Sequence, residues 1–197
     1  MSETPEADGF PSDYEIAQGA EMVPIWDLLR SYDLGNEDLE YYGEYKAKLN
    51  TDSVARLRSQ AADREQNLVL VTGMTPTPLG EGKTVTTVGL GQTLNAVGKE
   101  AMIAIREPSL GPVFGVKGGA AGGGYSQVLP MEDINLHFTG DLHALTSAHN
   151  LISAMLDARL SQSDDLDVDA TDVRWPRSLD MNDRALRQMV IGLGGKT

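Results

Sequence analysis

The stretch LVLVTGMTPTPLGEGKTVTTVGLGQTLNAVGKEAMIAI, residues 68–105, decides the fold. Its two ends, 68–72 and 101–105, are short apolar runs that are typical of buried strands. Residues 83–97 lie between them and show a helical pattern. A strand, a loop, a helix and a second strand in this order predict a βαβ unit with a right-handed connection.

The helix in this unit has a predictable inner face and a predictable end. Val85, Val88 and Leu94 follow helical spacing and are expected to point inward. Gly98 comes just after the last periodic residue, where glycine commonly ends a helix.

The flanking segments give weaker patterns. Residues 134–138, INLHF, are a strand candidate, and 142–160 show one apolar helical side. Before the unit, short helices are expected around 25–29 and across 49–64. The mixture predicts an α/β protein built around a largely parallel sheet.

The loop between the first strand and the helix carries the chemistry. Residues 77–84 read Thr-Pro-Leu-Gly-Glu-Gly-Lys-Thr, which matches the phosphate-binding loop except that Thr77 replaces the first glycine. Backbone N–H groups at a helix N-terminus attract an anion, and Lys83 is placed to reach the β- and γ-phosphates. The Thr84 hydroxyl is placed to bind Mg²⁺. The plainer alternative is an ordinary turn with an exposed lysine.

The predicted nucleotide loop therefore comprises eight consecutive residues, of which Lys83 also serves as a catalytic candidate: Thr77, Pro78, Leu79, Gly80, Glu81, Gly82, Lys83 and Thr84.

Arg106 and Glu107 follow the second predicted strand, at the end where ligands gather in parallel sheets. An arginine there can hold a carboxylate or an acyl phosphate with two parallel hydrogen bonds. The alternative is an ion pair between these neighbours that ties a loop. The glycine run 118–124 is either a linker or backbone that lies against a ligand or another chain.

Composition excludes several classes of protein. The chain has 197 residues, no cysteine and a net charge of −13, so disulfide frameworks, thiolate metal sites and nucleic-acid binding are not expected. No apolar run approaches the ~20 residues that span a bilayer. The first residues lack the basic and apolar pattern of a targeting segment, so a cytoplasmic protein without membrane partners is expected.

Three other patterns are discounted. The three histidines do not share a helix face and are not expected to bind metal. The acidic run 164–172 lacks the glycine and glutamate of a calcium loop. The final GLGGKT imitates a phosphate loop, but no helix can follow it.

Together these motifs closely resemble the formate–tetrahydrofolate ligase family across about residues 13–197. The blocks that carry the resemblance are DYEIAQ (13–18), EYKAKL (44–49), TPTPLGEGKTVTTVGLGQTLN (75–95), REPSLGPVFGVKGGAAGGGYSQVLPMEDINLHFTGDLHA (106–144) and LDMNDRALRQMVIGLGG (179–195).

The resemblance implies an ATP-dependent ligase of one-carbon metabolism. Such enzymes use MgATP to phosphorylate formate, and N10 of tetrahydrofolate then attacks the formyl phosphate. The family's phosphate loop starts with threonine, which accounts for Thr77. By matching position, Lys83 and Thr84 resemble the phosphate and magnesium residues, and Arg106 resembles the arginine that holds formyl phosphate.

The resemblance also implies a monovalent cation, potassium or ammonium, near Glu107 and Asp141, and a homotetramer. This sequence departs from the family at Val85 and at 158–159, and 164–172 is unusually acidic. Family chains are more than twice as long, and their aromatic pterin pocket lies outside the matched part.

These points predict a P-loop NTPase-like fold that is incomplete at its C-terminus. An acidic helical lead (1–66) precedes a nucleotide-binding α/β core (67–197), the N-terminal part of a larger ligase. The chain then carries the ATP and formyl-phosphate half of the site and makes no 10-formyltetrahydrofolate alone. The alternative is a noncatalytic or regulatory P-loop nucleotide-binding fragment.

Overall fold

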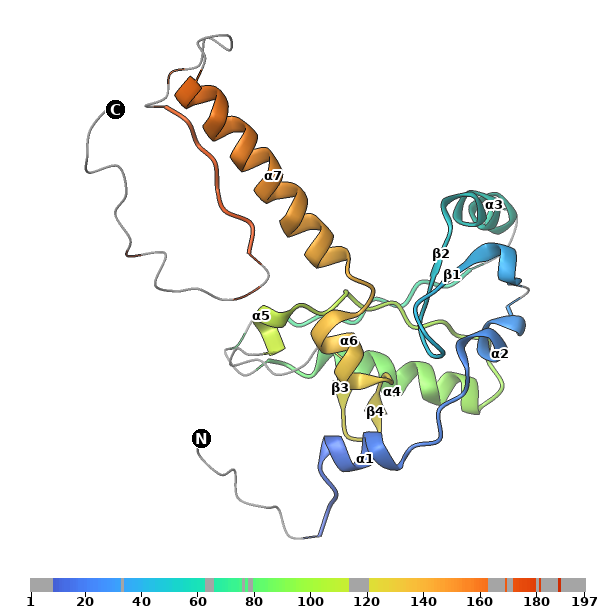
Figure 1. The fold of residues 1–197 in the computed structure, drawn as a ribbon. Helices are drawn as coiled ribbons and strands as arrows, with labels where there is room; N and C mark the ends of the chain where they lie inside the picture. The colour runs from blue at the N-terminus through green and yellow to red at the C-terminus, as the bar shows by residue number, and fades with distance from the viewer. Residues whose placement is uncertain are drawn as a thin grey trace.

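The computed structural model is a set of helices with two small antiparallel sheets (Figure 1). It describes residues 9–32, 34–62, 66–75, 77, 80–113, 121–162, 169, 172–179, 181 and 188. Pro78, Leu79, most of the acidic run 164–172 and the final GLGGKT lie outside the described residues.

The N-terminal part contains short helices and one hairpin. Its elements, in chain order, are α1 (Asp13–Gly19), α2 (Ile25–Arg30), a 3₁₀ turn (Asn36–Asp38), β1 (Leu39–Tyr41), β2 (Ala47–Leu49) and α3 (Thr51–Ala61). The helices α2 and α3 confirm the two expected in this region. The β1–β2 hairpin, which pairs Leu39 with Leu49, was not expected from the sequence.

A buried carboxylate fastens the hairpin to α3. Asp38 is only 4% exposed, and Arg56 donates to it at 2.5 Å. The Ser53 hydroxyl and the Gly35 N–H donate to the same carboxylate. These hydrogen bonds, first that from Ser53, lower the pKa of Asp38 to about 2. The lead segment is thus held by a charged network as well as by apolar packing.

Helix α4 (Lys83–Ala96) lies at the centre of the structure. Its end matches the prediction: Gly98 has φ +79°, and the N–H groups of Gly98 and Lys99 bond back to Asn95 and Leu94. Val88 is 1% exposed, as expected for the inner face. Val85, by contrast, is 42% exposed, so its inward placement was wrong for this structure.

Two glycines allow other segments to approach α4 closely. A Cβ on Gly91 would lie 2.3 Å from Cγ1 of Ile103, and one on Gly89 would lie 2.8 Å from Oγ of Ser126. The segment 101–105 and the second sheet therefore both pack against this helix. Close approach of this kind needs residues without side chains.

The second sheet is a tight hairpin of β3 (Gly122–Gly123) and β4 (Ser126–Gln127). Figure 1 shows it between α4 and α1. The carboxylate of Asp13, in α1, accepts a hydrogen bond of 2.7 Å from Gly124 N–H. The described end of the glycine run thus lies against this chain's own elements.

The C-terminal half holds α5 (Leu110–Val113), α6 (Met131–His137) and α7 (Asp141–Gln162). The long helix α7 confirms the predicted helix 142–160. The strand predicted at 134–138 was wrong, because most of these residues form α6. Pro130 precedes α6, and Glu132 and Asp133 lie in its first turn, where acids favour a helix.

The two apolar runs 68–72 and 101–105 follow open, non-helical paths and form no strand ladder among the described residues. Leu68 and Leu70 are 94% and 80% exposed, whereas a buried strand was expected. A parallel strand is buried only when neighbouring strands and helices cover both of its faces. The α/β character of the chain holds, but the parallel sheet stays a prediction.

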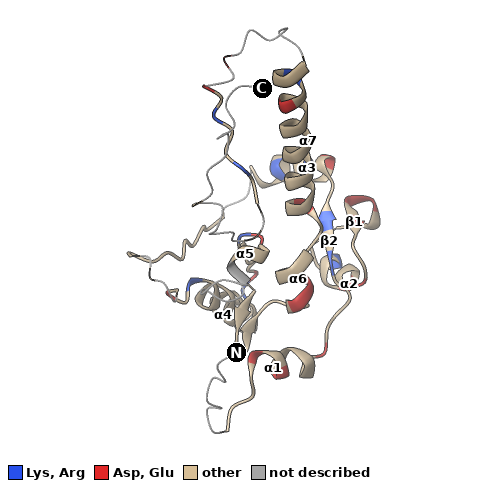
Figure 2. Cartoon of the chain, turned by 60° about the vertical axis from the view of Figure 1, so that its left-hand side comes forward, with Lys and Arg blue, Asp and Glu red and all other residues tan. Residues whose placement is uncertain are grey.

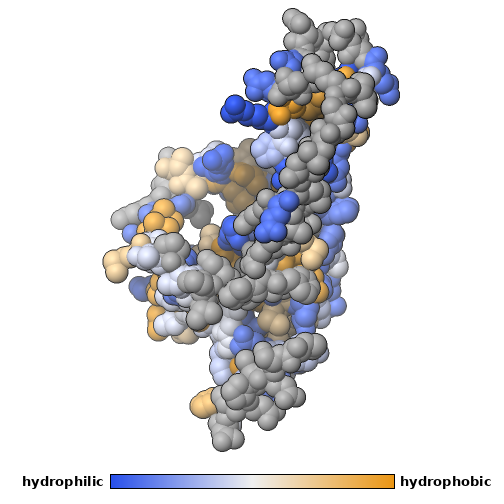
Figure 3. Space-filling view, turned by 90° about the vertical axis from the view of Figure 1, so that its left-hand side faces the viewer, coloured by the Kyte–Doolittle hydropathy of each residue, from blue (hydrophilic) through white to orange (hydrophobic). Residues whose placement is uncertain are grey.

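Apolar side chains also reach the surface on α7, including Leu145, Leu151 and Met155. In Figure 3, orange atoms are exposed in the upper part of the molecule, at the height of α7 in Figure 1. Trp175 contacts part of this helix: its ring stacks on that of His149, with the ring centres 5.0 Å apart, and its indole N–H donates to the Ser153 hydroxyl. Within the described residues, no helix is both long and apolar enough to cross a membrane.

Candidate anion-binding loop and acyl-group site

The predicted phosphate loop ends on a left-handed glycine. Gly82 caps α4 with φ +70°, and its carbonyl accepts the first helical hydrogen bond from Thr86 N–H at 2.9 Å. Thr77 and Gly80 close a turn before it, through Gly80 N–H to Thr77 O at 3.3 Å and Thr77 Oγ1 to Gly80 O at 3.0 Å. Gly80 has φ +92°, which favours glycine at this position.

Lys83 is the first residue of α4, and its ammonium donates to Oε2 of Glu81. The other oxygen of Glu81 accepts the Thr77 N–H. These two contacts, first that of Lys83, lower the pKa of Glu81 to about 2. The loop therefore already holds one carboxylate on donors that the sequence assigned to phosphates. Thr84 is half-buried in the next helical position.

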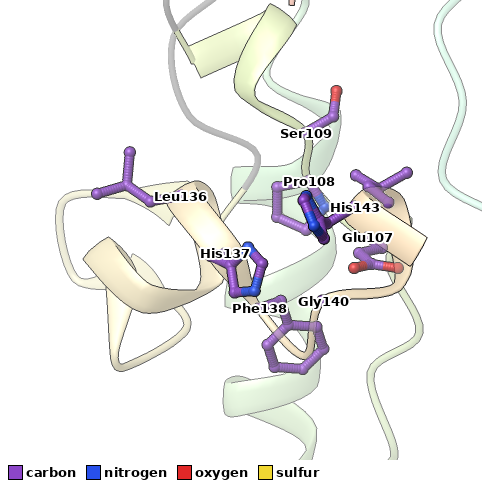
Figure 4. Close-up of a pocket in the computed structure, with 9 residues that line it drawn as sticks. Glu107, Pro108, Ser109, Leu136, His137, Phe138, Gly140 and His143 are labelled. Carbon is purple, nitrogen blue, oxygen red and sulfur yellow. The ribbon is translucent and has the colours of Figure 1, made fainter. Parts of the chain in front are cut away.

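The second predicted group lies after the segment 101–105. The Arg106 side chain is exposed, whereas Glu107 is half-buried and Pro108 is buried. Glu107, Pro108 and Ser109 line one side of a small hollow, and residues of the α6–α7 turn line the other. Figure 4 shows the rings of His137 and His143 on this hollow, near Pro108 and Glu107.

Asp141 opens α7 and is already paired. Its Oδ1 accepts from Lys48 Nζ at 2.5 Å, and its Oδ2 accepts from Thr139 Oγ1 at 2.9 Å. The hydrogen bonds from Lys48, first, and from Thr139 lower the pKa of Asp141, and the bond to Asp141 raises the pKa of Lys48. The Lys48 ammonium also lies 5.0 Å from the centre of the Tyr42 ring.

Lys48 is one of two lysines that the sequence reasoning missed. Lys46 pairs with Asp133 of α6 at 2.9 Å, and Figure 2 shows the blue of β2 next to the red of α6. Lys46 lies just before β2 and Lys48 lies in it, two residues apart, which is the spacing of side chains on one side of an extended chain. That alternation in EYKAKL is the signal that could have indicated acidic partners on one side of this segment, here Asp133 and Asp141.

The structure thus brings Glu107 to the turn that precedes Asp141, because Gly140 and Leu142 line the same hollow. It joins Lys83 to Glu81 and leaves Arg106 exposed. The predicted site residues therefore form two groups: the loop at the start of α4, and the hollow between 107–109 and the α6–α7 turn.

The two groups differ in how well they fit the expected ligands. The loop residues Thr77 and Lys83 suit the phosphates of MgATP, because their N–H and ammonium groups already donate to a carboxylate. A monovalent cation fits less well, because the Asp141 carboxylate is paired with the Lys48 ammonium. Among the residues that can be described, no three His, Asp or Glu side chains cluster as metal ligands. The cation assignment of Glu107 and Asp141 stays a prediction, and we derive no step through the ion.

The described residues of 77–84 hold a carboxylate beside the start of a helix, which is the arrangement expected of an anion-binding loop. The family model for formate–tetrahydrofolate ligase matches residues 11–197, so the chain belongs to the formate–tetrahydrofolate ligase family.

Two curated relatives named formate–tetrahydrofolate ligase are similar to this chain. The relative from Haloquadratum walsbyi is 76% identical over 192 residues, which cover 98% of this chain and 33% of the relative. The relative from Haloarcula marismortui is 77% identical over 176 residues, which cover 89% of this chain and 32% of the relative. The chain spans about a third of the length of these relatives.

Proposed function

We propose that residues 77–84 bind the phosphates of MgATP. The observation that carries this proposal is that Thr77 N–H and the Lys83 ammonium converge on one anionic group, the Glu81 carboxylate. A left-handed glycine starts α4 immediately beside that group. The N-terminal N–H groups of a helix add a positive potential at the same place.

Each residue of the loop has a proposed part in nucleotide binding. The Lys83 ammonium contacts the β- and γ-phosphates, and the Thr84 hydroxyl binds the Mg²⁺ that accompanies them. The remaining residues supply backbone N–H groups and shape the turn: Thr77, Pro78, Leu79, Gly80, Glu81 and Gly82.

We further propose that the protein ligates formate to tetrahydrofolate, as the names of its relatives state for them. A formate oxygen attacks the γ-phosphorus, the bond to ADP breaks, and formyl phosphate forms. N10 of tetrahydrofolate then attacks the formyl carbon, and phosphate leaves. Lys83 and Arg106 are the proposed catalytic residues of the first step, because fixed cations stabilise the charge on the transferred phosphoryl group.

Arg106 is the proposed holder of the acyl phosphate. Its planar guanidinium donates two parallel hydrogen bonds, which suit the oxygens of a carboxylate or phosphate. Its exposed position, two residues before the buried Pro108, leaves the side chain accessible to a ligand. This part of the proposal rests on the family's pattern and on the arginine's chemistry.

We propose that residues 67–197 form the nucleotide-binding body and that 1–66 form an acidic lead. In that body, 68–72 and 101–105 are neighbouring parallel strands, and α4 is the crossover between them. The close approach of Ile103 to Gly91 of α4 supports this arrangement. Apolar side chains exposed on 68–70 and α7 also support assembly into the homotetramer that the family pattern implies.

The test is MgATP binding measured by calorimetry with the 197-residue chain. Lys83→Ala should weaken binding by at least about tenfold, because a charged partner of phosphate is worth more than ~1.4 kcal/mol. Lys99→Ala, just after the same helix, is the matched control and should leave the affinity unchanged. Equal affinity of the wild type and Lys83→Ala would contradict the proposed loop.

Formate distinguishes the ligase from a noncatalytic nucleotide-binding protein. The ligase proposal expects ADP release from MgATP that depends on formate and is lost in Lys83→Ala. A chain that binds MgATP but shows no response to formate would favour the noncatalytic alternative for this span.

A further inference from the structure

We propose that Glu81 is an internal competitor of the nucleotide: its carboxylate occupies the phosphate-binding donors of the loop and has to leave them when phosphate binds. This inference rests on the proposed function of residues 77–84. It assigns to Glu81 a role in setting affinity, beyond its place in the loop sequence.

The first support is the pair of contacts that Glu81 makes. One oxygen accepts the N–H of Thr77, at the start of the loop, and the other accepts the ammonium of Lys83, at the start of α4. A carboxylate and a phosphate present the same features to these donors, namely negative charge and several acceptor oxygens. Glu81 therefore satisfies both donors with one side chain.

The second support is the position of this ion pair. A Cβ on Gly73 would lie 3.5 Å from Lys83 Nζ and 3.6 Å from Cβ of Glu81. The pair thus packs against the backbone where the segment 66–73 ends, between that segment and the start of α4. The Glu81 side chain is 17% exposed, whereas Lys83 is 45% exposed. The carboxylate is therefore the more buried partner of the pair, and the contact with it occupies part of an ammonium that is otherwise accessible.

The third support is the charge state of the carboxylate. The ammonium and the N–H donors favour its ionised form, which holds the pKa of Glu81 at about 2. The carboxylate is therefore negative at neutral pH and repels a phosphate that comes to the same donors. Nucleotide binding then has to break the contact between Glu81 and Lys83.

Substitutions at Glu81 separate competition from loop shaping. Glu81→Gln keeps the size of the side chain and an oxygen that accepts the Thr77 N–H, but it removes the charge. We expect it to bind MgATP about three- to tenfold more tightly than the wild type, as expected when a partly exposed ion pair no longer has to be broken. Glu100→Gln removes an exposed carboxylate near the far end of α4 and should leave the affinity unchanged.

A nucleotide-free measurement tests the same contact. Carbon-13 NMR of the Glu81 carboxyl should show its pKa well below the ordinary value of 4.5. In Lys83→Ala the pKa should rise toward that value, because the ammonium no longer stabilises the charged form. A Glu81 carboxyl that titrates normally in the wild type would overturn the inference, whatever the nucleotide affinity.

The binding outcomes distinguish this inference from the proposed function. If the wild type binds MgATP, Lys83→Ala does not, and Glu81→Gln binds no better than the wild type, the competitor role is wrong and the loop's function stands. Weaker binding by Glu81→Ala together with unchanged binding by Glu81→Gln would show that Glu81 only shapes the turn. If no variant binds MgATP, the proposed function fails and the competitor role fails with it.

Discussion

Among the described residues, three carboxylates that accept a hydrogen bond from a cationic side chain have a lowered pKa. Asp38 is paired with Arg56, Glu81 with Lys83, and Asp141 with Lys48, and the pKa of each carboxyl is lowered. The chain has 29 acidic residues but only 16 basic ones, so acidic side chains outnumber the basic side chains that can pair with them. At the candidate loop, Lys83 is therefore already engaged by a carboxylate, as the proposed competition requires.

Arg106 is exposed and has the proposed acyl-phosphate role, which depends on its planar guanidinium. Arg106→Lys should leave MgATP binding unchanged but reduce formate-dependent ADP release. Lysine keeps the charge and loses the planar pair of donors, and loss of a fixed donor to the transition state costs about 2–4 kcal/mol. The measurement is ADP release at saturating formate.

Arg30→Lys serves as the control for Arg106→Lys, because Arg30 forms an exposed pair with Asp27 within α2. It should show the wild-type rate. If Arg106→Lys also keeps the wild-type rate, Arg106 is a structural residue and the acyl-phosphate role is wrong.

At the scale of elements, α4 is a helix whose glycines serve packing. Glycine in a helix costs roughly 0.5–1 kcal/mol relative to alanine. At Gly91 that cost is offset, because a side chain would collide with Ile103. The helix can therefore carry the loop on one end and still contact the segment that leads to Arg106. These contacts link the two groups of candidate residues.

Gly91→Ala should therefore destabilise the protein, against the usual preference for alanine in a helix. A new Cβ at 2.3 Å from Cγ1 of Ile103 forces a shift, and overpacking of this kind costs about 1–3 kcal/mol in the free energy of unfolding. Urea unfolding followed by circular dichroism measures this change.

The control for this prediction is Gly19→Ala, at the last residue of α1, where a Cβ meets no atom within 4 Å. It should change the free energy of unfolding by less than about 0.5 kcal/mol. The double variant Gly91→Ala with Ile103→Ala should cost less than the sum of the two single changes, because the collision is gone. Strict additivity would contradict the packing argument.

At the scale of the whole molecule, excess negative charge and exposed apolar side chains occur together. The net charge is −13, and the lead 1–66 alone holds 15 acidic and 6 basic residues. Self-repulsion of this charge opposes compaction, while salt screens it. The described structure offsets the repulsion in part by pairing Lys46, just before β2, and Lys48 of β2 with the acids of α6 and α7.

We expect added KCl to raise the thermal unfolding midpoint of the chain. Most of the rise should occur as the salt increases from about 0.01 M to 1 M, over which the screening length falls from about 30 Å to about 3 Å. Sucrose at matched osmolarity is the control, since it is neutral and does not screen charge. A midpoint that falls with KCl would show that the ion pairs outweigh the net repulsion.

The sequence by itself determined the features that depend on neighbouring residues. Helix α4 begins at Lys83 and ends before Gly98, as the loop motif and the glycine stop predicted. The helix 142–160 and the family followed in the same way from local pattern and from the long motif blocks. Capping, periodicity and turn chemistry act within a few residues, so they can be read along the chain.

Local pattern also had a clear limit at 134–138. These residues alternate in polarity like a strand, yet the residues before them supply a helix start, and α6 forms. A short segment is compatible with both structures, and here the helix start at Pro130, Glu132 and Asp133 prevails over the alternation. The same reasoning failed for Val85, whose exposure depends on which elements pack beside α4.

Only the tertiary structure decided which partners meet. Lys48 and Asp141 are 93 residues apart, and Gly124 and Asp13 are 111 apart, so no local rule links them. The contact between Glu81 and Lys83, by contrast, joins residues only two positions apart. Contacts between distant segments, and the burial of the residues that make them, depend on how whole elements pack. No short stretch of sequence contains that information.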